Sequence, residues 1–225
     1  MNWQPVINCS TDASGARLAG LQQQIVVIVD LIDMSTTLEA ALEGGALNVY
    51  GASPDQASAP VPVDPVAIGY QAGREARSRS ASVVIVAEPR WGGNRQRLRS
   101  CRSVIKGLRA AGVAEYQIVP NLGITTAKLV SFEQSVVIAV TNSGGVAFDA
   151  ARTAGGTVLT ATIARTWRMR GEEPAEAGVN RALALATALK KDLCFVAASS
   201  KAQEDILAAQ YLTRLAILRR DLAGV

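Results

Sequence analysis

The stretch 25–37, which reads IVVIVDLIDMSTT, decides the fold. Its first five residues, Ile25–Val29, are aliphatic and continuous, which is typical of a strand buried on both faces. Asp30 follows that strand, and Ser35–Thr37 begin a helix whose hydroxyl groups can cap its first turn. A buried strand that leads directly into a helix indicates a βα unit, the building block of parallel sheets.

The same pattern continues along the chain. We expect further strands at 47–50, 82–87, 116–119, 135–140, 157–162 and 193–197. We expect helices at 36–43, 66–79, 94–111, 174–191 and 202–222, and one ending at Arg152. The sequence therefore predicts an α/β fold, a three-layer α/β/α arrangement with a mostly parallel sheet. It is expected to be one domain over 1–225, with residues 1–20 as a loosely held N-terminal lead-in.

The amino-acid composition excludes several classes of catalytic site. The chain has 225 residues, 49% of them hydrophobic and 19% charged, as expected for a globular protein. It contains no histidine, which excludes Ser-His-Asp triads, Cys-His pairs and histidine-ligated zinc. Its three cysteines are widely spaced, so neither a zinc site nor a disulfide framework is indicated, and we expect a cytoplasmic protein.

Polar residues follow several of the expected strands, at the edge where parallel sheets bind ligands. Asp30 could ligate a hard cation such as Mg²⁺, although a simple helix cap would explain its loop equally well. The loop after strand 82–87 holds Glu88 and Arg90, which could bind a metal and an oxyanion or simply pair with each other.

The segment Thr141-Asn142-Ser143-Gly144-Gly145 joins another expected strand to a helix. Its hydroxyls and free N–H groups could surround a phosphate, sulfonate or carboxylate, or the glycines could merely form a turn. We expect the hydroxyls of Thr141 and Ser143 to bind such an anion. No Walker or GxGxxG sequence is present, so nucleotide binding has no specific support.

A basic stripe recurs at helical spacing within 94–111. A formal net charge of +4 is too small to indicate nucleic-acid or membrane binding by itself, and a solvated helix face explains the stripe best. We therefore expect no nucleic acid and no membrane as partner. The cations of this stripe are Arg95, Arg99, Arg102, Lys106 and Arg109.

Taken together, these segments resemble the 2-phosphosulfolactate phosphatase family from about Ile25 to Leu215. The stretch 28–37 is similar to the family's "IDVLRASTT", 41–46 to "ALANGA", and 140–144 to "TTNGT". Glu88, Arg90 and the glycines that follow resemble a stretched "GERGG", and 204–205 fall where the family has "LED". Three positions depart from the pattern: Asp33 and Gly145 or Val146 stand where the family has arginines, and Asn121 replaces an aspartate.

The resemblance implies Mg²⁺-assisted hydrolysis of a small anionic phosphate ester by a phosphoric monoester hydrolase, and we expect a homodimer. Asp30, Glu88 and Asp33 would be catalytic, with Asp30 and Glu88 also holding the metal. The substrate-binding residues would be Ser35, Thr36, Arg90, Asn121, Thr141, Asn142, Ser143 and Gly144.

The departures leave two alternatives open. The chain could be a diverged member that acts on a small carboxylate or sulfonate metabolite, because the missing arginines weaken binding of a phosphate dianion. It could also be a non-catalytic homologue. An isochorismatase-like hydrolase is disfavoured, because Cys101 and Cys194 lie inside an expected helix and strand.

Overall fold

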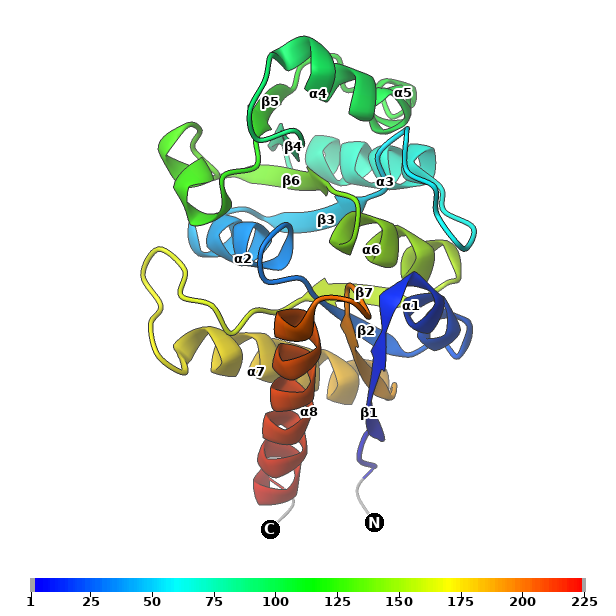
Figure 1. Cartoon of the computed structure of the whole chain (residues 1–225), viewed down its shortest axis with the longest axis vertical. Helices are drawn as coiled ribbons and strands as arrows, with labels where there is room; N and C mark the ends of the chain where they lie inside the picture. The colour runs from blue at the N-terminus through cyan, green and yellow to red at the C-terminus, as the bar shows by residue number, and fades with distance from the viewer. Residues whose placement is uncertain (1–2, 224–225) are drawn as a thin grey trace.

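A computed structural model describes residues 3–223 of the chain (Figure 1). The strands are β1 (Ile7–Thr11), β2 (Ile25–Val29), β3 (Asn48–Ala52), β4 (Ser82–Ala87), β5 (Gln117–Pro120), β6 (Ser135–Val140), β7 (Thr157–Thr160) and β8 (Leu193–Ala197). The helices are α1 (Asp12–Leu21), α2 (Ser35–Glu43), α3 (Pro65–Ser78), α4 (Asn94–Ser100), α5 (Arg102–Ala110), α6 (Gly144–Thr153), α7 (Glu173–Leu189), α8 (Gln203–Ala223) and the 3₁₀ helix η1 (Gly123–Lys128).

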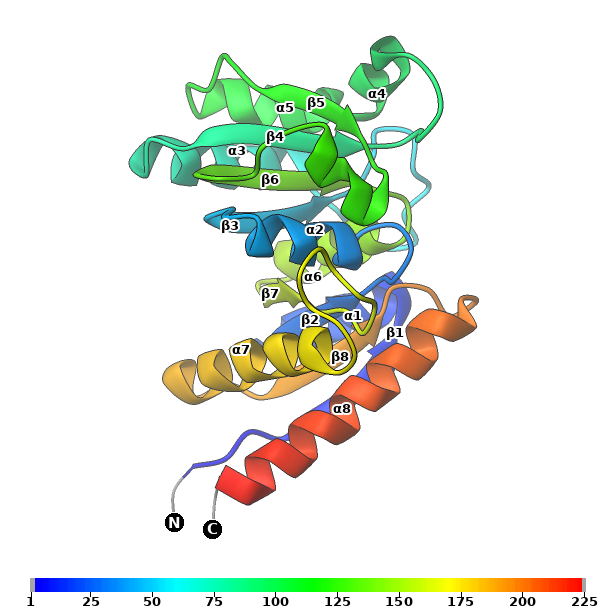
Figure 2. The ribbon, with the colours of Figure 1, turned by 90° about the vertical axis from the view of Figure 1, so that its left-hand side faces the viewer.

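The strands form two sheets of four, in the orders β1-β8-β2-β7 and β3-β6-β4-β5, and the paired strands are parallel throughout. Helices α7 and α8 cover one face of the first sheet, while α1 and α6 cover the other (Figure 2). On the second sheet, α2 with η1 and α3 with α5 take the two faces. This is the three-layer α/β/α architecture expected from the sequence, divided between two sheets rather than one.

Small aliphatic side chains fill the core. Along β2, Ile25, Val27 and Val29 pack towards α7 and α8, and the alternate residues Val26 and Ile28 pack into a core shared by both sheets. Burial on both faces explains why this strand has no polar residue.

Helices α3 and α5 approach each other closely through glycines. A Cβ atom on Gly69 would lie 2.1 Å from the carbonyl oxygen of Val104, and one on Gly107 would lie 2.1 Å from that of Val66. The contact between these two helices therefore depends on the absence of a side chain at both positions.

Helix α2 contacts both sheets through its polar residues. The Thr37 hydroxyl donates to Asn121 Oδ1 (2.8 Å) after β5, and Glu39 Oε1 accepts from Thr160 of β7 (2.7 Å) and from Arg181 of α7 (2.5 Å). At the end of the helix, the Glu43 carboxylate accepts the N–H groups of residues 167, 168 and 169. One short helix thus bonds to the second sheet and to the helix and loops around the first.

Two expectations about the elements are wrong. Residues 7–20 are not a loose lead-in, since they form β1, which pairs with β8, and most of α1; Met1 and Asn2 lie outside the described residues. The helix expected at 94–111 is interrupted at Cys101, whose φ of −109° and ψ of 10° are not helical. The Cys101 side chain is fully buried at this break.

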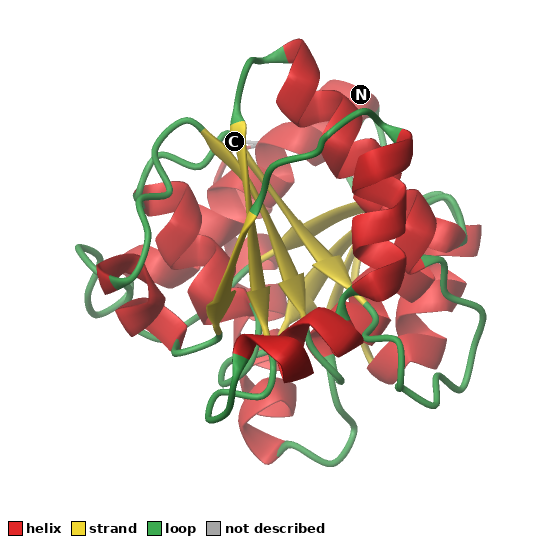
Figure 3. Ribbon diagram, turned by 90° about the horizontal axis from the view of Figure 1, so that it is seen from above, coloured by secondary structure: helices red, strands yellow, loops and turns green. Residues whose placement is uncertain are grey.

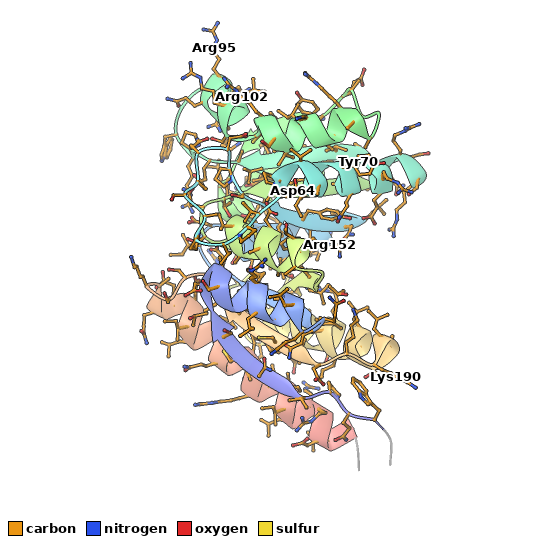
Figure 4. The ribbon with its side chains drawn as sticks, turned by 90° about the vertical axis from the view of Figure 1, so that its right-hand side faces the viewer. Asp64, Tyr70, Arg95, Arg102, Arg152 and Lys190 are labelled. Carbon is orange, nitrogen blue, oxygen red and sulfur yellow. The ribbon has the colours of Figure 1, made fainter. Side chains whose placement is uncertain are left out.

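The proline-rich connection 53–64 is fixed by one buried carboxylate. Asp149 of α6 accepts the N–H of Ser53 (3.2 Å) and the N–H of Asp64 (2.7 Å), and so holds both ends of the connection. Asp64 in turn caps α3, at the place labelled in Figure 4, by accepting from the N–H of Ala67. Burial raises the pKa of Asp149 to about 6.

All strands point the same way, so their carboxyl ends gather at one edge of the molecule (Figure 3). The loops that were expected to carry the site therefore lie at the same edge. Across residues 3–223, none of the helices combines the length and apolar character needed to cross a bilayer.

Candidate functional site

Asp30, the residue that follows β2, is buried, with 3% of its surface exposed. Its Oδ1 accepts the N–H of Asp33 (2.9 Å), and its Oδ2 accepts the N–H of Gly144 at the start of α6 (2.8 Å). Burial raises the pKa of Asp30, and the charge of Asp33 acts in the same direction, while these N–H groups oppose the shift. The Asp30 carboxylate thus joins the loop after β2 to the loop after β6.

The loop Thr141–Gly145 was expected to place its N–H groups around a bound oxyanion. In the structure these donors are already used: Gly144 donates to Asp30, and Gly145 donates to the Thr141 hydroxyl (2.8 Å). Thr141 is fully buried, whereas Asn142 is exposed and Ser143 half-buried. The anion at the start of α6 is the protein's own carboxylate, so the N–H groups of Gly144 and Gly145 are not free to bind a ligand as the loop now stands.

Ser35 and Thr36 also bond within the protein. The Ser35 hydroxyl donates to the carbonyl of Ile28 (2.8 Å) and accepts the N–H of Asp30 (3.0 Å). Thr36 donates to the carbonyl of Leu31 (2.6 Å) and lies 2.8 Å from the hydroxyl of Thr162. Both hydroxyls hold the loop 30–35 in shape, which leaves them poorly placed to bind a substrate.

A second group of predicted residues does come together. The Arg90 guanidinium pairs with the Asp33 carboxylate (2.5 Å) and lies 3.6 Å from Glu88 Oε1. The backbone N–H of Arg90 donates to Glu88 Oε2 (3.0 Å). Asn121 donates to Glu88 Oε1 (3.1 Å) and to the carbonyl of Asp33. Asn121 is fully buried, so it fixes the Glu88 carboxylate rather than meeting a ligand itself.

The open part of this edge is a cavity of about 580 Å³ beside the Glu88 loop. Asn142 lines it, as do Asp33 and Glu88, whose side chains are 40% and 27% exposed. Sequence reasoning missed the rest of its polar lining, which consists of Gln56, Gln96, Arg99 and Ser100. The size suits a small metabolite.

Two signals could have identified these missing residues. Gln56 belongs to the proline-rich connection, which Asp149 anchors close to the sheet edge. Arg99 belongs to the basic stripe, all five cations of which are exposed, as a solvated helix face requires. Arg95 and Arg102 extend outward from α4 and α5 in Figure 4, whereas Arg99 lines the cavity.

A smaller cavity of about 380 Å³ continues along the edge towards the first sheet. It shares Gln56 and Asn142 with the larger one, and Ser143, Ser199 and Lys201 line its far part. The two cavities therefore lie side by side at the carboxyl ends of the strands.

Asp205, in the first turn of α8, is a second buried aspartate beside the loop 30–35. Its Oδ1 accepts the N–H of Leu31 (2.9 Å). Burial raises the pKa of Asp205 to about 7, and the charges of Asp30, Glu204 and Asp33 act in the same direction. The negative charges of Asp30 and Asp33, from the loop after β2, therefore repel that of Asp205 from α8.

The donor set does not suit Mg²⁺. Both oxygens of Asp30 accept backbone N–H groups, and the oxygens of Glu88 accept from Arg90 and Asn121. Within residues 3–223, no three carboxylate or cysteine side chains are close enough together to hold a metal ion. A Mg²⁺ ion at Asp30 and Glu88 would compete with these donors for the carboxylate oxygens, and Asp30 is buried, so we derive no step through a metal.

The cysteines offer no nucleophile at this site. None forms a disulfide, and burial raises the pKa of both Cys101 and Cys194 to about 12. The third, Cys9, lies on β1 and lines neither cavity.

Comparison with known proteins gives no family for this site. No protein-family model matches the chain, and no curated protein matches it in sequence. The function must therefore be argued from the geometry.

Proposed function

We propose that the chain is an enzyme that hydrolyses an ester of a small carboxylate or sulfonate metabolite in the larger cavity. The observation that supports this proposal is the position of Glu88, which lines the cavity. Its carboxylate is fixed by hydrogen bonds from the Asn121 side-chain amide and the Arg90 backbone N–H. A carboxylate fixed in this way can act as a general base towards a water molecule in the cavity.

The charges around the cavity indicate the kind of substrate. Arg90 is used by Asp33 and Glu88, so Arg99 is the cation left to bind an anionic group; no ion pair of Arg99 is found in the described part of the chain. The cavity lining thus combines one available guanidinium, that of Arg99, with the carboxylates of Asp33 and Glu88. This balance of charge favours binding of a singly charged substrate group over a phosphate dianion. A carboxylate or a sulfonate fits this balance better than the phosphate ester that the family resemblance implies.

In the proposed reaction, Arg99 binds the anionic group of the substrate and Glu88 takes a proton from water. The water oxygen then attacks the ester carbonyl, the bond to the leaving alcohol breaks, and the alkoxide receives the proton that Glu88 took from the water, which restores the Glu88 carboxylate. Gln56, Gln96 and Asn142 supply the neutral hydrogen-bonding groups of the cavity.

The test is a panel of small esters that bear a carboxylate, a sulfonate or a phosphate, assayed with and without Mg²⁺. We expect turnover of a carboxylate or sulfonate ester without added metal, and a loss of roughly 100-fold or more in kcat for Glu88→Gln. Glu115→Gln, at an exposed position outside the cavity, is the control. Turnover of phosphate monoesters that requires Mg²⁺ would contradict the proposal and support the reaction implied by the resemblance.

Binding can be measured separately, with sulfoacetate and malonate as calorimetric probes. Arg99→Gln should weaken binding by roughly tenfold or more, the scale of one charge-assisted hydrogen bond. Arg95→Gln should bind as the wild type does, because Arg95 does not line the cavity and extends outward in Figure 4.

A non-catalytic binding protein is the second candidate. The observation that favours it is that Asp30, Asp33 and Glu88 all have partners within the protein. Probe binding without turnover of any ester, unchanged in Glu88→Gln, would support this candidate.

A further inference from the structure

Helix α8 carries an apolar stripe on its outer side. Four large side chains are exposed there: Leu207 (54%), Tyr211 (39%), Leu218 (61%) and Leu222 (74%). At 3.6 residues per turn these four positions fall within an arc of roughly 60°. In Figure 2, α8 runs along the outer edge of the lower half, with the first sheet on its inner side.

The inner side of the same helix is already packed. Ala208, Ala209, Leu212 and Ala216 are fully buried against the first sheet and α7. The helix is therefore anchored by a separate set of residues, and the outer stripe is additional apolar surface. Several large apolar side chains exposed on one side of a helix are typical of an interface.

We propose that the stripe on α8 binds the same stripe of a second copy of this chain, with the two helices antiparallel. The spacing of the four residues is 4, 7 and 4, and it reads identically from either end of the helix. An antiparallel pair therefore places Leu207 opposite Leu222 of the partner subunit, and Tyr211 opposite Leu218 of the partner subunit. This self-complementary surface is what a two-fold interface requires.

The charges on α8 favour the same orientation. Glu204 is exposed in its first turn, and Arg219, whose side chain is 42% exposed and pairs with Glu176 of α7, lies near its end. In an antiparallel pair the acidic end of each helix lies beside the basic end of the other, and the helix dipoles are opposed. A parallel pair would bring like charges together at both ends.

Arg214 is the one charged residue within the stripe. It lies between Tyr211 and Leu218, so two copies of it flank the proposed two-fold axis. Its long side chain can carry the guanidinium to the edge of the interface while the stem packs. The two guanidinium groups still repel each other across the axis, so Arg214 should weaken the dimer.

The first experiment is analytical ultracentrifugation of the full chain, from below 1 µM to about 100 µM. We expect a species of twice the chain mass, a loss of at least 100-fold in association for Leu218→Glu, and at least tenfold tighter association for Arg214→Leu. The control, Leu129→Glu, changes a leucine of similar exposure (51%) that lies just after η1, away from α8. Circular dichroism of each variant checks that it is folded.

The second experiment tests the orientation by oxidative cross-linking in a Cys9→Ser background. A mixture of Leu207→Cys and Leu222→Cys chains should form the mixed disulfide, while either variant alone should not. A wild-type chain that stays monomeric over the whole range would overturn the proposal, as would a dimer that tolerates Leu218→Glu. Cross-linking of either single variant with itself would overturn the antiparallel arrangement.

Discussion

Two carboxylates stand at equivalent positions in the fold, Asp30 after β2 and Glu88 after β4, yet their surroundings differ. Asp30 is buried and accepts one backbone N–H on each oxygen. The Glu88 carboxylate accepts hydrogen bonds from the Asn121 side chain and the Arg90 backbone N–H. Its side chain is still 27% exposed, and it lines a cavity. Asp30 is thus placed to stabilise the fold, whereas Glu88 is placed to meet a ligand.

The difference shows that a carboxylate at the end of a parallel strand does not by itself indicate a ligand-binding site. The start of α6 could have bound an external anion, but Asp30 occupies that position. Ligand binding then falls to the neighbouring loops, where the proline-rich connection and α4 leave space. The following predictions test this contrast, beginning with the largest expected effect.

Asp30→Ala should lower the free energy of unfolding by about 2–4 kcal/mol, because two buried N–H groups lose their acceptor. Asp30→Asn should cost less, since its amide oxygen can still accept from one of them. Urea denaturation measures both, and Glu88→Gln is the comparison, expected within about 1 kcal/mol of the wild type. Equal destabilisation at Asp30 and Glu88 would remove the distinction between them.

Gly144→Ala should cost about 1–3 kcal/mol, the usual scale of overpacking. A Cβ atom there would lie 2.3 Å from Asp30 Oδ2 and 2.7 Å from the Cβ of Met34, so the Asp30 contact would have to open. The matched control is Gly93→Ala, where an added Cβ would have no neighbour within 4 Å. Thermal unfolding distinguishes them, and equal melting temperatures would contradict close packing at Gly144.

Asp205→Asn should change the pH dependence of stability. The pKa of Asp205 is raised to about 7, so between about pH 4 and about pH 7 the folded state binds more protons than the unfolded state. This group therefore makes the wild type less stable as the pH rises through that range. Asparagine cannot titrate, and the variant should gain about 1–2 kcal/mol relative to the wild type between about pH 4 and about pH 8. A difference in unfolding free energy that stays constant with pH would show that Asp205 has an ordinary pKa.

Mg²⁺ should have the smallest effect, with no resolvable change in melting temperature at millimolar concentration. The reason is that the oxygens of Asp30 and Glu88 already accept N–H groups of the protein. A cation that bound the folded state would raise the melting temperature by mass action. A dose-dependent rise that Asp30→Asn abolishes would restore the metal site expected from the resemblance.

The sequence predicted the framework well, because continuous aliphatic runs such as Ile25–Val29 admit few alternatives to a buried parallel strand. It failed at residues 7–20, where half-buried β1 and the small-residue helix α1 lack that signal. The division into two sheets also depends on strand pairing, which periodicity does not encode.

For the site, the sequence identified Asp33, Glu88, Arg90 and Asn121, which do lie together. It did not show that Asp30 would occupy the start of α6, because that contact joins residues 114 positions apart. Nor did it identify Arg99, since a cation that lines a cavity and one in bulk solvent have the same helical spacing.

Helix α2 has a consequence for how the molecule unfolds. Its nine residues bond to Asn121 on one side and to Thr160, Arg181 and the loop 167–169 on the other. Neither half can open at α2 without breaking buried bonds that also order the other half. The amides of β4 and β8, which belong to different sheets, should therefore exchange with solvent through the same global opening, so that the two sheets behave as one cooperative unit.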